Sequence, residues 1–319
     1  MAKPANPPRT VTRPAPAPAR MERVRPLDLA LLHALPSLAL RARCVMDGYV
    51  TGLHRSPKKG FSVEFSDYRA YLPGDDLRRI DWRLFGRTDR LFLKEYEQET
   101  QLRVFLVLDT SASMDYASRP GAWMKKIDFA RTVLAAVGLL ALRQGDAFGM
   151  ASIGDDLGAF MGPKASQAHW RTLVGRMDAV QTGGSTGLAK GLSALAELLP
   201  RRSLVMIASD FYEDADALNM ALRRLRFDLH EVIGLHVLDP AEVTLGDEWS
   251  GTFVDSESGE RLVLDTASVR KGYLERFQAF LDRTQTEFLN QGGDYALQRT
   301  DASPMAALGM FLARREHIH

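Results

Sequence analysis

Five oxygen-bearing side chains occupy three short segments of the sequence, and all are types that bind hard divalent cations. They are a carboxylate and two hydroxyls in one DxSxS segment, a threonine in a glycine-rich segment and an aspartate after an apolar run: Asp109, Ser111, Ser113, Thr186 and Asp210. Magnesium takes about six oxygen ligands near 2.1 Å and usually keeps several waters, so a few carboxylates and several hydroxyls can form its site. We therefore expect these residues to bind one Mg²⁺, or Mn²⁺ or Ca²⁺ in its place, directly or through water.

The number of carboxylates at such a site decides what the bound ion can do next. If Asp109 or Asp210 binds through water, the ion keeps net positive charge at its open coordination position. A carboxylate from a partner protein can then complete the coordination sphere. Four direct carboxylates would remove this attraction, so the sequence favours partner binding through an Asp or Glu of the partner.

The DxSxS segment and Asp210 must be positioned by the strands that precede them, and the glycine-rich segment offers its hydroxyl from a neighbouring loop. Short apolar runs at Val104–Leu108, Leu204–Ala208 and Val232–Leu238 are typical of buried parallel strands. Helical periodicity fills the intervals at about 123–143, 166–179, 187–199 and 214–226. The alternation predicts an α/β fold with a doubly wound, mostly parallel sheet of Rossmann type. Ligands of such sheets bind beyond the carboxyl ends of the strands, where Asp109 and Asp210 stand.

Turn residues complete the predicted domain. Gly154-Asp155-Asp156 predicts an antiparallel hairpin at one edge of the sheet, and Glu257-Ser258-Gly259 predicts another hairpin. A helix over about 266–290 and a short strand at Tyr295–Gln298 are expected to close the domain.

Composition excludes several classes of protein. The chain has 319 residues, of which 45% are hydrophobic, so it can bury a full core. Its net charge of +1 gives no reason to expect nucleic-acid binding by the body of the protein. The longest apolar run, Val133–Leu142, is much shorter than the roughly 20 residues that span a bilayer. With Cys44 as the one cysteine, these features favour a reducing compartment, and we expect the protein in the cytoplasm.

The segment before the first predicted parallel strand has a different composition. Residues 1–26 are rich in proline and carry six basic residues and one acidic residue, which predicts a flexible basic tail. Residues 27–50 suit one or two short helices broken near Pro36, and extended runs follow at Phe61–Phe65 and Leu91–Glu97. The intervening residues 66–82 are dense in carboxylates and guanidinium groups and predict an ion-paired loop.

Two resemblances sharpen this interpretation. The DxSxS segment, then Thr186, then Asp210 resemble the three-part metal-ion-dependent adhesion site (MIDAS) of von Willebrand factor A domains. The charged segment resembles the signature of the bacterial domain-of-unknown-function family 58 (DUF58), and the likeness covers roughly residues 25–250. The residues that carry the signature, which could bind a partner or be structural, are Arg69, Tyr71, Gly74, Asp75, Asp76, Arg78, Asp81, Trp82 and Arg87.

The DUF58 resemblance implies an A-like domain after the signature. It also implies an association with a MoxR-type AAA+ ATPase and a role in the assembly or maturation of other proteins. Four parts of the chain are expected: a disordered basic tail, an N-terminal module with the signature loop, the A-like domain and a C-terminal helix or tail, at residues 1–26, 27–100, 101–300 and 301–319. The expected function is metal-dependent protein binding without catalysis.

Two alternatives remain. The first is a structural scaffold whose metal site is empty and whose Arg69–Asp81 loop binds the partner. The second is a serine hydrolase, because residues 183–187 fit G-x-S-x-G around Ser185, and Asp210 is followed by His230 and His236. A nucleophile elbow needs a buried strand directly before its serine, whereas residues 177–182 resemble a helix end and a loop. Metal-dependent binding is therefore favoured over hydrolysis.

Overall fold

A computed structural model describes most of the chain. The described residues are 29–54, 68–70, 82–88, 90–94, 102–245, 250–254 and 261–318. The predicted basic tail at residues 1–26 and the extended run at Phe61–Phe65 lie outside these ranges.

A six-stranded sheet forms the centre of the fold and confirms the predicted α/β class. In spatial order the strands are β10 (Asp294–Arg299), β7 (Glu231–Leu238), β6 (Ser203–Ser209), β3 (Arg103–Asp109), β4 (Ala147–Ile153) and β5 (Leu157–Lys164). All neighbouring pairs are parallel except β4 and β5, which form the antiparallel edge hairpin predicted at Gly154-Asp155-Asp156. The three predicted apolar runs are β3, β6 and β7, as expected.

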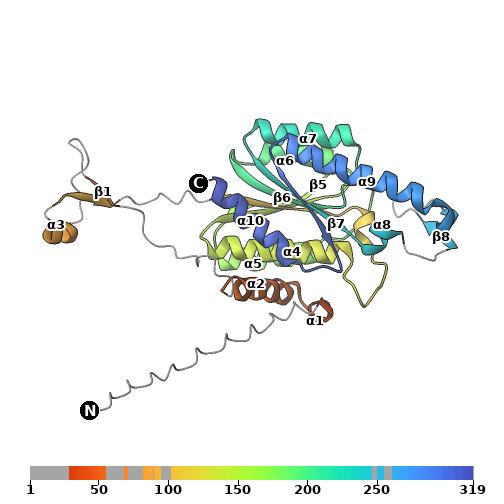
Figure 1. Ribbon diagram of the computed structural model, residues 1–319, viewed down its shortest axis with the longest axis horizontal. Helices are drawn as coiled ribbons and strands as arrows, with labels where there is room; N and C mark the ends of the chain where they lie inside the picture. Colours follow the sequence, from red (N-terminus) through yellow and green to blue (C-terminus); the bar gives the residue numbers. More distant parts are fainter. Residues whose placement is uncertain are drawn as a thin grey trace, which may run out of the picture.

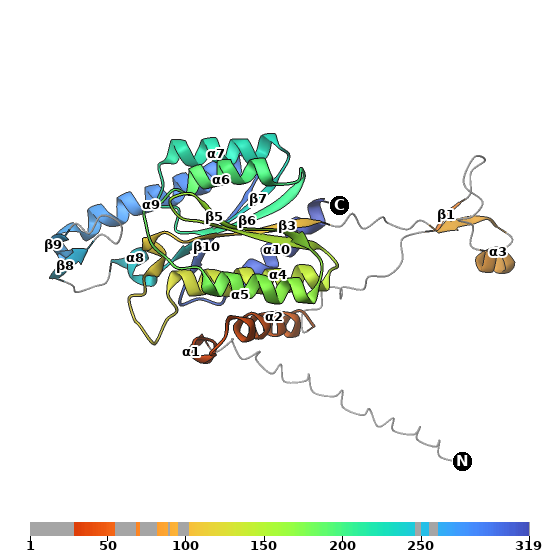
Figure 2. The same ribbon diagram turned by 180° about the vertical axis from the view of Figure 1, so that it is seen from behind.

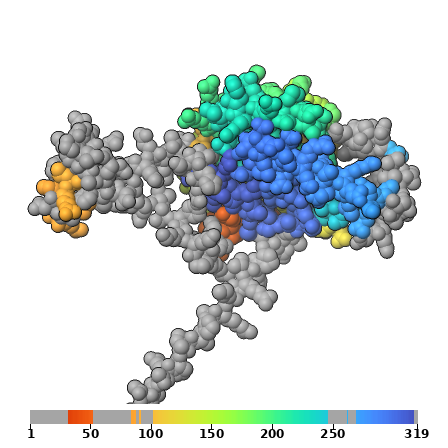
Figure 3. Space-filling model, turned by 45° about the horizontal axis from the view of Figure 1, so that its top comes forward, coloured from red at the N-terminus to blue at the C-terminus, as the bar shows by residue number. Residues whose placement is uncertain are grey.

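Helices cover both faces of the sheet. One face carries α4 (Lys126–Arg143), α5 (Gln167–Ala179) and α10 (Met305–Ile318), and the other carries α6 (Leu188–Leu198), α7 (Ala215–Phe227) and α9 (Thr266–Asn290) (Figures 1 and 2). Alternate residues of β3 explain the two layers, because Leu106 packs with the α4 side and Phe105 with the α6 side. The helices α7 and α9 lie side by side on the outer surface (Figure 3).

The first two helices add to the layer over α4. They are α1 (Leu29–Ala34) and α2 (Leu38–His54), and they confirm the predicted break near Pro36. Ala42 and Met46 of α2 belong to the same buried cluster as the inner residues of α4, and Arg41 Nε donates to Thr132 Oγ1 at 3.2 Å. This part of the predicted N-terminal module therefore shares the core of the sheet domain (Figure 1).

Two pairs of short strands lie outside the main sheet. The strands β1 (Tyr68–Ala70) and β2 (Phe92–Lys94) are antiparallel, with α3 (Trp82–Thr88) between them in the chain. The prediction of a loop throughout residues 66–82 is therefore wrong at β1, because cross-strand hydrogen bonding to β2 outweighs the charged local sequence. The strands β8 (Ser250–Val254) and β9 (Arg261–Asp265) confirm the second hairpin, whose predicted turn lies outside the described residues.

The strand order determines where the polar loops meet. The chain leaves β3 toward β4 on one side and returns to β6 on the other, so the direction of winding reverses at β3. In open parallel sheets this reversal opens a crevice at the carboxyl ends of the strands. The 3₁₀ helix η2 (Ala112–Asp115) after β3 and the helix α8 (Pro240–Thr244) after β7 stand at this end of the sheet. Across the described ranges, no helix is both long enough and apolar enough to cross a membrane.

Packing of β7 against α9 gives a first prediction. A Cβ on Gly234 would lie 2.6 Å from the Phe288 ring, which is itself fully buried, so the ring would have to move. We expect Gly234→Ala to lower the free energy of unfolding by about 1–3 kcal/mol in urea denaturation. Gly162→Ala in β5 is the control, because no heavy atom lies within 4 Å of the added Cβ. Equal stability of the two variants would show that this contact does not restrict β7.

Candidate metal site

Asp109 ends β3 with its carboxylate buried and held from two sides. Its Oδ1 accepts a hydrogen bond from Ser111 N at 2.9 Å, and its Oδ2 accepts one from Ser209 Oγ at 2.5 Å. Only 2% of Asp109 is exposed, so these donors replace the water that the carboxylate loses on folding. The end of β3 and the end of β6 are thereby joined through one carboxylate.

The two hydroxyls of the DxSxS segment lie side by side next to this carboxylate. Ser111 Oγ and Ser113 Oγ are 3.0 Å apart, and Ser111 caps no helix with its side chain. Adjacent ligands of an octahedral Mg²⁺ with bonds near 2.1 Å are also about 3.0 Å apart. Among the described residues, no three His, Cys, Asp or Glu side chains form a metal-binding group, so an ion here would depend on hydroxyls. The donor set fits a hard divalent cation.

The raised pKa of Asp109 also favours a cation at this place. Burial raises the pKa of Asp109 to about 6, and the nearby charge of Asp210 contributes to the rise. A carboxylate in this state is stabilised as the anion by a cation placed close to it. The site thus has more negative charge than its buried surroundings favour.

The loop that contains Thr186 lies against the DxSxS loop. Gly183 N donates to Thr110 O at 2.9 Å, and Ala112 N donates to Gly184 O at 3.3 Å. The position of this loop is further fixed at the β4–β5 turn, where Gly187 N donates to Gly154 O at 3.0 Å. The DxSxS loop and the Thr186 loop therefore meet at the carboxyl end of the sheet.

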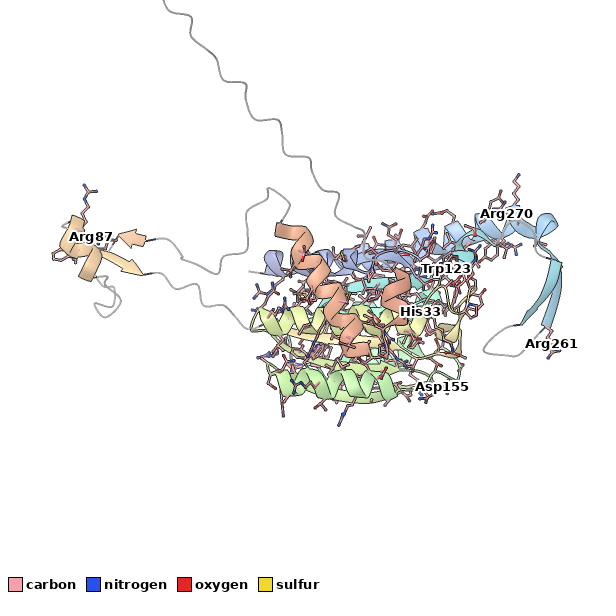
Figure 4. All side chains as sticks on the ribbon, turned by 90° about the horizontal axis from the view of Figure 1, so that it is seen from below. His33, Arg87, Trp123, Asp155, Arg261 and Arg270 are labelled. Atoms are coloured by element: carbon pink, nitrogen blue, oxygen red, sulfur yellow. The ribbon has the colours of Figure 1, made fainter. Side chains whose placement is uncertain are left out.

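Asp155 holds this loop from the outside. Its Oδ1 accepts from Ser185 N at 2.6 Å and from Ser185 Oγ at 2.9 Å. Figure 4 places Asp155 at the end of the domain where Trp123, in the loop before α4, also lies. The Ser185 hydroxyl is thus engaged with Asp155. A Cβ on Gly187 would lie 2.2 Å from Asp155 O, so this close approach requires glycine.

Asp210 follows β6 and is fully buried. Its Oδ2 lies 2.8 Å from Lys126 Nζ, which in turn lies 2.6 Å from Glu242 Oε1 of α8. Phe211 has a φ of 51°, uncommon for an aromatic residue, and its N–H donates to Ser209 Oγ at 2.8 Å. Asp210 therefore contacts a buried lysine that the sequence prediction did not include.

Lys126 begins α4 on the inward face of the helix. Phe129, Ala130 and Val133 follow at the spacing of one helix face, and all are buried. A lysine at the first position of an apolar helix face is the sequence signal that could have predicted the burial of Lys126. Burial alone lowers the pKa of Lys126, but Asp210 and Glu242 outweigh this effect and the net shift is upward. The lysine is therefore charged inside the domain.

The residues of the hydrolase alternative have other partners. Residues 180–187 between α5 and α6 contain no strand, so the strand that a nucleophile elbow requires is missing there. His230 Nδ1 accepts from Ser203 N at 3.2 Å, and His236 Nδ1 is 2.7 Å from Tyr295 Oη. In the described part of the chain, Ser185 is thus hydrogen-bonded to Asp155, His230 to Ser203 and His236 to Tyr295.

Few residues of the charged signature can be placed. Arg69 lies in β1, where it pairs in register with Leu93, Trp82 begins α3, and Arg87 stands exposed in the last turn of α3 (Figure 4). The remaining members lie outside the described residues: Tyr71, Gly74, Asp75, Asp76, Arg78 and Asp81.

One known protein family matches the greater part of the chain. The family described as "Protein of unknown function DUF58" matches residues 67–281, more than half of the chain. The chain belongs to the DUF58 family. The uncharacterized proteins Rv1480 of Mycobacterium tuberculosis and Mb1516 of Mycobacterium bovis are each 29% identical to it over 293 residues, covering 90% of this chain and 90% of each relative.

Solved structures with a similar fold share little sequence with this DUF58 protein. The conserved hypothetical protein BatB from Bacteroides thetaiotaomicron is 14% identical with a TM-score of 0.42, covering 68% of this chain and 99% of that one. The VWA domain of SpRpn10 is 12% identical with a TM-score of 0.40, covering 66% and 95%. These likenesses are weak, so the fold is defined here by its own strand order.

His236 gives a prediction of pH dependence. Burial lowers the pKa of His236 to about 3, whereas an unfolded histidine titrates near 6.5. The unfolded chain therefore binds the extra proton first, and this residue alone removes about 2 kcal/mol of stability between pH 7 and pH 5. We expect His236→Gln to lose this part of the acid sensitivity in urea unfolding with EDTA present.

The control keeps the histidine and removes its hydrogen bond. Tyr295→Phe should retain the steep loss of stability between pH 7 and pH 5, because His236 stays buried. An unchanged pH profile in His236→Gln would mean that other groups cause the acid sensitivity.

Proposed function

We propose that this DUF58 protein is a metal-dependent protein-binding module and not an enzyme. The observation that carries the proposal is the 3.0 Å separation of Ser111 Oγ and Ser113 Oγ beside the buried carboxylate of Asp109. Two hydroxyls and a shielded carboxylate suit a hard cation with an open coordination position.

The residues have distinct parts in this proposal. Ser111, Ser113 and Thr186 would hold Mg²⁺, or Mn²⁺ or Ca²⁺, through their hydroxyls. Asp109 and Asp210 would supply negative charge to the cation, directly or through water. The hydrogen bonds to Asp109 and the contact of Asp210 with Lys126 keep both carboxylates oriented. When bound, the cation supplies an electrophilic position that accepts a carboxylate oxygen. An Asp or Glu of a partner protein is therefore the proposed ligand.

The partner is proposed from the family signature. A MoxR-type AAA+ ATPase, or a protein that it helps to assemble, would present the carboxylate to the loops after β3 and β6. The single cysteine, Cys44, is free and partly buried, which suits the reducing cytoplasm in which such an ATPase works. DUF58 proteins of this kind would then link the ATPase to a client during assembly or maturation.

Metal linkage gives the first test. A ligand that binds the folded state raises the melting temperature, and the stabilisation grows as RT ln(1 + c/Kd), where c is the free ligand concentration. We expect Mg²⁺ or Mn²⁺ to raise the Tm of the wild type by several degrees relative to EDTA, and Asp109→Ala to lose this rise. His317 and His319 should be replaced in all samples, because terminal histidines can bind metal adventitiously.

Asp115→Ala is the matched control for this experiment. Asp115 is an exposed carboxylate in η2 whose contact is Lys125 Nζ at 2.8 Å, outside the proposed ligand set. It should keep the full metal response. If neither the wild type nor Asp115→Ala responds to metal, the scaffold with an empty site and partner binding through the Arg69–Asp81 loop becomes the better account.

Partner capture gives a second test. Binding of the purified MoxR-type ATPase from the same organism should require Mg²⁺ or Mn²⁺ and should be lost in Asp109→Ala, as measured by surface plasmon resonance. We expect at least a tenfold loss of affinity, which corresponds to about 1.4 kcal/mol. Binding that persists in EDTA and in the variant would contradict the proposed mechanism.

A further inference from the structure

Lys126 is a buried cation built into the candidate metal site. Its side chain has no exposed surface, and its ammonium group contacts Asp210 Oδ2 at 2.8 Å and Glu242 Oε1 at 2.6 Å. The ring of Tyr212 adds a third contact, with Nζ 5.3 Å from its centroid. Burying an ammonium ion this deeply is unfavourable unless close carboxylates compensate it. The position of Lys126 is therefore tied to the charges of the site.

The groups around Lys126 are fixed by further contacts. Glu242 Oε2 accepts from Asp239 N at 2.7 Å in the capping box of α8, and Tyr273 Oη donates to Glu242 O at 2.6 Å. Asp239 Oδ2 also accepts from Ser118 N at 3.0 Å, in the loop between η2 and α4. This network joins the segments that follow β3, β6 and β7 to one another. Lys126 thus lies at a fixed place relative to Asp210.

Counting formal charges shows what this lysine changes. With both carboxylates ionised, Asp109 and Asp210 together carry two negative charges, and Lys126 cancels one of them. With a divalent cation added, these groups sum to plus one with the lysine and to zero without it. Glu242 is present in both cases, so its charge does not alter the difference of one unit. The lysine makes the site one charge more positive whether or not a metal is bound.

We propose that Lys126 tunes the metal site for partner capture, by weakening the binding of the divalent cation and strengthening that of a partner's carboxylate. The inference rests on the proposed function and deepens it. At an effective dielectric constant near 20, two unit charges several ångströms apart interact strongly enough to change an affinity more than tenfold. Lys126 does not touch the partner, because its side chain is fully buried. It acts as a positioning and charge-setting residue through Asp210.

A purely structural role for Lys126 makes a different prediction. If the lysine only held Asp210 in place, its removal would disorder the loop and weaken metal binding and partner binding alike. Charge setting predicts opposite signs, with tighter metal and weaker carboxylate binding. The sign of the change in metal affinity therefore separates the two roles.

Mn²⁺ binding to the full chain tests this sign directly. Free Mn²⁺ would be titrated by electron paramagnetic resonance in protein with His317 and His319 replaced. We expect Lys126→Met to bind Mn²⁺ at least tenfold more tightly than the wild type, and Asp109→Ala to remove the added binding.

A second variant keeps the proposal testable if Lys126→Met fails to fold. Glu242→Gln preserves shape, leaves Lys126 in place and makes the site one charge more positive. It should bind Mn²⁺ at least threefold more weakly than the wild type. A folded Lys126→Met that binds Mn²⁺ no more tightly than the wild type would overturn the inference, as would tighter binding by Glu242→Gln.

The outcomes also separate this inference from the proposed function. If the wild type shows no Mn²⁺ binding through Asp109 but Lys126→Met gains it, the proposed function fails, while the weakening of metal binding by Lys126 stands. If the wild type binds Mn²⁺ through Asp109 and Lys126→Met binds it no better, the proposed function stands and the role of Lys126 is overturned.

Discussion

The buried carboxylate of Asp109 is the constraint on which the polar end of the domain depends. It ends the central strand β3, where the winding of the sheet reverses, and its two oxygens are held by Ser111 N and Ser209 Oγ. A carboxylate in this position must be compensated, since an unpaired buried charge is among the costliest features that a folded protein can contain. The loops after β3 and β6 therefore cannot be positioned independently of one another.

The same constraint extends outward to the neighbouring strands. Asp210 adds a second buried carboxylate directly after β6, and Lys126 from α4 supplies the opposite charge together with a link to Glu242 of α8. Backbone hydrogen bonds from the DxSxS loop to the Gly183–Gly184 segment bring the Thr186 loop to the same place. The rigid parallel sheet below positions the ends of these loops, while the charges determine how they meet.

The sequence predicts the sheet well because burial on both faces leaves a strong local pattern. The runs at β3, β6 and β7 are continuous and apolar, and each of the intervening helices has its own periodicity. Asp109 and Asp210 could be chosen by the same reasoning, since they stand at the ends of β3 and β6. Thr186 lies between two helices and was chosen from the motif alone. Lys126 could not be assigned a partner, because its contact with Asp210 joins residues far apart in the chain. Strand β1 was missed because three residues carry too short a pattern, and its stability comes from pairing with β2.

The two cations that such a site can use differ in a way that has functional consequences. A lysine is part of the chain and places a single positive charge beside a carboxylate. It can therefore stabilise the folded domain, but it has no open coordination position for a ligand from outside. A divalent ion exchanges with solvent and keeps open positions for incoming oxygens. Lys126 compensates Asp210 from within the core. One oxygen of Asp109 accepts from Ser209 Oγ, and the other accepts from the backbone of Ser111. The hydroxyl of Ser111 is in turn paired with that of Ser113. In the proposed function, dividing the two tasks between two cations leaves Asp210 compensated by Lys126 when the exchangeable ion is absent.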